Sequence, residues 1–129
     1  MTSLQDPAAQ ALEDLITQLR ESAAVFDETA LRATGLLAHH GRGASWRCIM
    51  SNEPQPLVVE VMTAELERLT QAAGRWRREN ARALYAEGLT MDKIAELFRV
   101  TRQRVSVLLQ PPPASPDKPS LPPSTATPR

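Results

Sequence analysis

The longest regular pattern in this 129-residue chain is an alternation of four- and three-residue steps between Leu57 and Glu87. Apolar or small residues and one asparagine mark these steps: Met62, Leu66, Leu69, Ala73, Trp76, Asn80 and Ala83. Such spacing places one stripe of a helix against a neighbouring helix, as in coiled coils. The segment therefore predicts a helix of about 46 Å at 1.5 Å per residue. It ends at Gly88 and is either continuous or divided at Gly74.

Further helices are expected before this segment. Asp6 is a capping residue and Pro7 suits the first helical position, so a helix begins here and is expected to end near Phe26. Asp27 can cap a second helix, which Gly41 would end. The long helix packs either on these helices or on a second copy of the chain, in which Asn80 would fix the register.

The last nineteen residues have a different composition. Residues 111–129 contain eight of the eleven prolines and almost no apolar side chains. Such a segment cannot bury a core, so we expect a disordered tail with polyproline character. It also cannot form a β-hairpin wing after residue 110.

Several classes of protein are excluded by composition. A single cysteine, Cys48, excludes an internal disulfide and a cysteine-based metal site. We expect Cys48 to be a buried, inert thiol; the alternative is a redox sensor. His39 and His40 are adjacent and face different directions, so no metal site is expected.

No nucleophile with a base, glycine-rich phosphate loop or carboxylate constellation is present, so we expect no enzymatic activity and no cofactor. No apolar run spans a membrane and no signal peptide begins the chain, so a cytoplasmic protein is expected. Trp46 and Trp76 are expected to pack in a core or an interface.

The formal net charge of zero conceals a segregation of charge. Residues 1–67 carry four basic and ten acidic side chains, whereas residues 68–110 carry nine basic and four acidic ones. This division is typical of a polyanion-binding module joined to an assembly module, although a chance division of solvated charge would look the same.

The basic region ends in two short amphipathic segments, LTMDKIAELF and TRQRVSVLLQ. Thr90 and Thr101 can cap the two helices. The inward residues would be Ile94, Ala95 and Phe98 in the first helix, and Val105, Leu108 and Leu109 in the second.

This pattern, over residues 76–110, resembles the bacterial helix-turn-helix of transcription regulators and of the DNA-binding region at the end of sigma factors. The resemblance implies an all-α protein with a helical N-terminal region over residues 1–75, a long connecting helix and a three-helix reader without a wing. The family usually has glycine at the turn, where this chain has Arg99. If the turn keeps the family's conformation, Arg99 must take positive φ, at a cost of about 1 kcal/mol.

The resemblance places Arg102, Gln103 and Arg104 in the first turn of a recognition helix. Arginine can bind guanine and glutamine can bind adenine, each through two hydrogen bonds. We expect Gln103, one arginine and Ser106 to read bases, and the other arginine to hold phosphate. The remaining expected DNA contacts are Thr90, Lys93, Arg99 and the capping Thr101, with Arg78 and Arg82 from the preceding helix.

The expected function is a sequence-specific transcription regulator of the bacterial nucleoid that binds double-stranded DNA. A homodimer assembled through residues 1–75 would double the contacts and set half-sites about 34 Å or a multiple of this distance apart. The alternative is an adaptor whose helix-turn-helix contacts RNA polymerase, a sigma factor or another regulator without reading DNA. The two exposed arginines at a helix start, where acids are favoured, support DNA binding over a protein contact.

Overall fold

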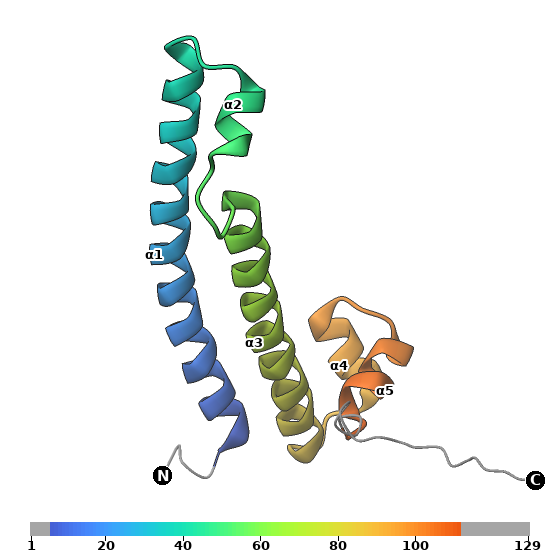
Figure 1. Ribbon diagram of the computed structural model, residues 1–129. Helices are drawn as coiled ribbons and strands as arrows, with labels where there is room; N and C mark the ends of the chain where they lie inside the picture. Colours follow the sequence, from blue (N-terminus) through green and yellow to red (C-terminus); the bar gives the residue numbers. More distant parts are fainter. Residues whose placement is uncertain (1–5, 112–129) are drawn as a thin grey trace, which may run out of the picture.

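The computed structural model describes residues 6–111, and within them every regular element is an α-helix, which confirms the all-α prediction. The elements are α1 (Pro7–Gly41), α2 (Trp46–Ser51), α3 (Val58–Ala86), α4 (Met91–Phe98) and α5 (Arg102–Leu109). Helices α1 and α3 lie side by side and antiparallel, with α2 beside the far end of α1 (Figure 1). Helices α4 and α5 pack only on the C-terminal part of α3 (Figure 1). The predicted disordered tail, apart from Pro111, lies outside the described residues.

Helix α1 begins as the sequence predicts, because Oδ1 of Asp6 accepts the amides of Ala8 and Ala9, each at 3.1 Å. The predicted break between Phe26 and Asp27 is wrong, since α1 continues for 35 residues. No glycine or proline interrupts the chain there, and α3 lies alongside α1, with Thr29 buried just after the expected break. Support from α3 outweighs the local preference of an aspartate for a helix start.

Helix α3 is also continuous, and Gly74 does not divide it. The boundary drawn at residue 76 therefore falls inside one helix. Helix α3 packs on α1 of the same chain, yet Met62 and Leu66 of the predicted stripe remain 41% and 48% exposed. The start of the stripe is thus not the face that α3 turns toward α1, whereas Ala83 near its end lies at a hollow with Pro7 and Ala8 of α1.

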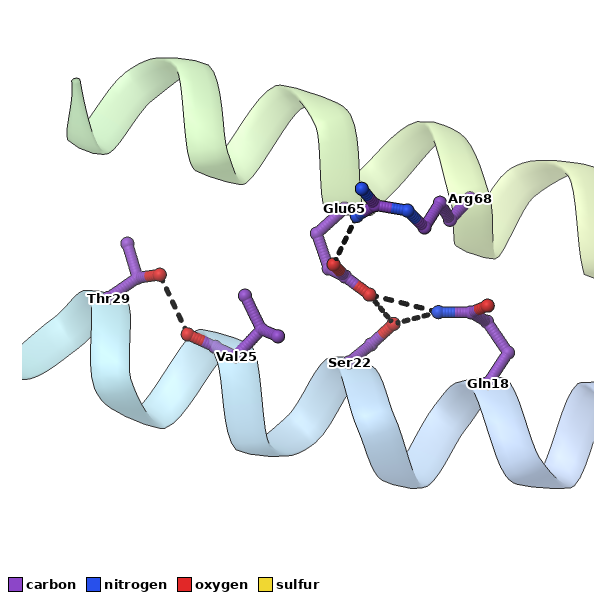
Figure 2. A network of polar contacts seen from close by, with 6 residues as sticks. All are labelled: Gln18, Ser22, Val25, Thr29, Glu65 and Arg68. Atoms are coloured by element: carbon purple, nitrogen blue, oxygen red, sulfur yellow. Dashed lines mark hydrogen bonds and ion pairs between the residues drawn. The ribbon is translucent and has the colours of Figure 1, made fainter. Parts of the chain in front are cut away.

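A polar network joins the two long helices at their centre (Figure 2). Glu65 of α3 is only 4% exposed. Its Oε2 accepts the Ser22 hydroxyl at 2.6 Å and the Gln18 amide at 2.9 Å, both from α1. Its Oε1 accepts Nη1 of Arg68 at 2.7 Å. A buried carboxylate needs such partners, so this network restricts how the two helices can slide past each other.

The short helix α2 buries only Ile49. Cys48 is exposed, so the predicted buried thiol is wrong. Trp46 is 50% exposed and stacks on the His40 ring, with ring centroids 4.0 Å apart. A helix of six residues turns few side chains inward, which leaves its neighbours at the surface. None of the helices in residues 6–111 combines the length and the apolar character needed to cross a membrane.

Candidate nucleic-acid interface

The C-terminal part of α3, with α4 and α5, has a core of its own. Ile94, Val105 and Ala81 are fully buried, one from each of the three helices. Ala95 and Leu108 complete the buried set, and Phe98 and Leu109 pack against it. The inward residues predicted for both short segments thus lie together. This core fixes α5 on α4 and α3, so the remaining faces of α5 point to solvent.

Both predicted caps are confirmed. Oγ1 of Thr90 accepts the amide of Lys93, and Oγ1 of Thr101 accepts the amide of Arg104, each at 3.1 Å. Arg99 has φ 59° and ψ 46°, so the non-glycine residue at the turn does take the left-handed conformation. Its amide donates to the Glu96 carbonyl at 3.3 Å. This left-handed residue ends α4 and turns the chain sharply into α5.

The first turn of α5 is exposed. Arg102, Gln103 and Arg104 all lie at the surface, whereas Ser106 is partly buried. Because Val105 and Leu108 face the core, Gln103 points most directly outward, with the two arginines on its flanks. One ion pair limits Arg102, whose Nη1 lies 3.7 Å from Oδ1 of Asp92 on α4.

The structure adds Val107 to this face. It follows Gln103 by one helical turn and is 49% exposed. Sequence reasoning passed over it because a valine between two core positions of a short helix looks like another core residue. Only its angle from Val105 and Leu108 reveals that it is turned outward.

The other predicted contacts differ in how free they are. Lys93 is exposed, and its Nζ lies 3.2 Å from Oε1 of Glu96 on the same helix. Arg82 is held by the protein itself, since it pairs with Glu79 at 3.1 Å and donates to the Gln110 carbonyl at 2.9 Å. Its position favours a structural role, joining α3 to the end of α5.

Arg78 lies on α3. Its Nη1 would stand 3.6 Å from a Cβ placed on Gly74, so the side chain runs back along α3 toward that glycine. The structure thus brings the turn residue Arg99 and the first turn of α5 to one region of the surface, and places Arg78 and Arg82 outside it.

The charge of the two short helices is positive but mixed. Residues 88–110 contain four basic side chains, Lys93, Arg99, Arg102 and Arg104, against Asp92 and Glu96. The acids lie on α4 and the arginines at the turn and on α5. Helix α5 is therefore the element best suited to a polyanion. In the described part of the chain no group of three or more acidic, histidine or cysteine residues could hold a metal ion.

Comparisons with protein-family models, curated proteins and solved structures found no match.

Proposed function

We propose that this chain is a transcription regulator that binds double-stranded DNA as a dimer and reads the major groove with α5. The observation that carries the proposal is the exposed basic start of α5. Two arginines and a glutamine occupy the first turn of a helix whose other side is locked into a core. An arginine near a helix N-terminus opposes the helix dipole, so this arrangement is more stable with an anion such as phosphate beside it.

Base reading falls to the residues that point outward. Gln103 would bind an adenine edge through two hydrogen bonds, and Arg104 or Arg102 a guanine edge. Val107 would contact the methyl group of a thymine one helical turn along the groove. Arg102 forms an ion pair with Asp92, so it is the better candidate for a phosphate contact. Arg104 is then the better candidate for a base contact.

Positioning falls to the flanking groups. Lys93 in the first turn of α4 and Arg99 at the turn both precede α5 in sequence, and both are exposed. Their cations would hold phosphates beside the groove that α5 enters, as would the hydroxyls of Thr90 and Thr101.

The test begins with the full chain and a randomised duplex pool at about 50 and 200 mM salt, followed by sequencing of the bound fraction. We expect a two-fold symmetric motif and affinity that falls steeply with salt. Absence of binding at the lower salt concentration would refute the proposal, because non-specific attraction to DNA should already appear there.

Variants then separate the roles. Gln103→Ala should relax preference at one base position at a cost of about 1–3 kcal/mol. Lys93→Ala should weaken all sequences alike and lower the salt slope by about one unit. Arg47→Ala on α2 is the matched control, since it removes an exposed cation far from α5 and should change neither property.

A second candidate is an adaptor that binds a protein of the transcription machinery. The outward side of α4 favours it, because Leu97 is 57% exposed between the acidic Glu96 and the turn. Leu97→Ser with intact DNA binding but lost binding to RNA polymerase or a sigma factor would support this role. Unchanged binding to both would exclude α4 as the contact surface.

A further inference from the structure

Helix α1 carries a second apolar stripe beside the face that contacts α3. Its members follow one another at steps of four and three residues: Leu12, Ile16, Leu19, Ala23, Phe26, Ala30, Ala33 and Leu37. Leu19 is 48% exposed and Leu37 64% exposed. The residues that α1 buries are different ones, Ala11, Ser22 and Thr29. Helix α1 therefore has two adjacent seams, and the fold of one chain covers only one of them.

The stripe of α3 lies on the same face of the molecule. An apolar hollow of about 410 Å³ runs between the two stripes, with Phe26, Ala30 and Ala33 of α1 on one side and Met62 and Leu66 of α3 on the other. Nearer the start of α3, Val59 is 62% exposed and adds another apolar side chain to the surface. Helices α4 and α5 do not contact α1 (Figure 1). Phe98 of α4 lies at a hollow with Ala73, Trp76 and Asn80, so α4 flanks the stripe in the second half of α3 and leaves its first half, with Met62 and Leu66, open.

The covered seam between α1 and α3 is polar at its centre, where Glu65, Ser22 and Gln18 form their network. Among residues 6–111, the one apolar residue that α1 or α3 fully buries outside the α3–α4–α5 core is Ala11. A helix pair needs apolar burial to be stable, and here many of the large apolar side chains of α1 and α3 remain exposed.

We propose that a second copy of this chain covers this face, so that two helical pairs form a four-helix bundle whose two-fold axis runs parallel to α1 and α3. The same face on both copies meets itself, as a two-fold interface requires. In each chain the two stripes have the seven-residue period that such bundles pack with knobs in holes. The inference deepens the proposed function by naming the surface that holds the dimer, and the apolar face supports it without reference to DNA.

Charges along the edges of the stripes favour this axis. Gln18 contacts Glu65, and Asp14 contacts Arg75, which fixes the relative height of residues on α1 and α3. With a parallel axis, α1 lies over α3 of the second copy at these same heights.

Glu13 then stands near Arg77 of the second copy, and Arg20 near Glu67. All four side chains are exposed, and none has an ion-pair partner within residues 6–111. An axis perpendicular to the helices would instead place α1 on α1 and α3 on α3. The parallel axis is the arrangement that brings these opposite charges together at the heights already fixed within one chain.

The axis has a consequence for the proposed DNA contact. Because both copies run in the same direction, the two α5 helices lie at the same end of the bundle. A perpendicular axis would place them at opposite ends.

The first test measures the mass of the full chain without DNA by sedimentation equilibrium at micromolar concentration. We expect twice the mass of one chain. Ile16→Glu should give the monomer mass, whereas Leu31→Glu should stay dimeric, because Leu31 is 73% exposed and lies off the stripe. Helical content from circular dichroism shows whether each variant remains folded.

Glu13→Arg should raise the dimer dissociation constant about tenfold, and adding Arg77→Glu should restore it. A wild-type monomer, or a Leu31→Glu variant that dissociates as readily as Ile16→Glu, would overturn the proposal.

The second test uses the native cysteine. Cys48 is exposed, lies at the α2 end of the molecule and accepts a spin label without any substitution. With the parallel axis the two labels lie at the same end, within about 30 Å, since neighbouring helix axes are 8–10 Å apart. With a perpendicular axis they lie at opposite ends, more than about 40 Å apart at 1.5 Å per residue. A distance in the longer range would overturn the proposed axis. Both tests are made without DNA, so failure of DNA binding leaves their outcome unchanged.

Discussion

Replacement of Ser22 by alanine tests whether the buried network holds α1 on α3. The Ser22 hydroxyl donates to Oε2 of Glu65 at 2.6 Å, within a site where Glu65 is 4% exposed. A hydrogen bond to a charged group contributes about 1.5–3 kcal/mol. Alanine favours a helix over serine by about 0.5 kcal/mol, which offsets part of the loss. Ser22→Ala should therefore lower the free energy of unfolding by about 1–2.5 kcal/mol.

The assay is urea unfolding followed by circular dichroism, at one protein concentration for all variants, because a dimer unfolds at a concentration-dependent midpoint. With a urea slope of about 1–3 kcal/mol per molar, the midpoint should fall by roughly 1 M. Thr34→Ala is the control, since its hydroxyl is exposed and donates only to the Ala30 carbonyl of its own helix at 2.9 Å. If Ser22→Ala is as stable as Thr34→Ala, the network does not hold the pair of helices and the reasoning is refuted.

Two further predictions concern the turn and the edge of the helical pair. Arg99→Gly should raise the free energy of unfolding by about 1 kcal/mol, because glycine adopts the left-handed conformation without strain. The same variant should bind DNA more weakly at low salt. Equal stability of the variant and the wild type in thermal unfolding would show that the turn is unstrained. The ion pair with Arg75 and a hydrogen bond from Gln10 hold the pKa of Asp14 below its ordinary value. A depressed pKa means that this contribution to stability is present above the ordinary pKa and is lost as pH falls through the folded-state pKa. Arg75→Met should return the pKa of Asp14 in NMR titration toward the ordinary value, and an unchanged pKa would exclude the pairing.

Local rules of sequence determine where most of the helices begin and end. Asp6, Thr90 and Thr101 each accept amides at a helix start, as their types predict. Arg99 takes the positive φ that the turn requires, in place of the glycine that the resemblance implies. These features depend on residues within four positions of one another, so the sequence specifies them without knowledge of the rest of the fold.

The break predicted at Asp27 shows where such rules stop. An aspartate in the middle of an apolar pattern carries the same local signal as one at a helix start. Helix α3, some thirty residues further along the chain, lies beside this part of α1 and keeps it helical. Propensity is a weak term, and packing on a neighbouring helix overrides it.

The sequence by itself determined that this protein is all-α, that two short capped helices follow a long one, and that an exposed basic turn begins the last. Only the tertiary structure decided which face of each long helix is covered. Helices α1 and α3 each have two adjacent seams, and helical spacing alone does not say which is buried. The observed contact between α1 and α3 gives Glu65 its three hydrogen-bond donors. Burial of a carboxylate without partners costs far more free energy than exposure of leucine side chains. The same packing leaves the apolar stripes open, turns Val107 outward and ties Arg82 to the end of α5.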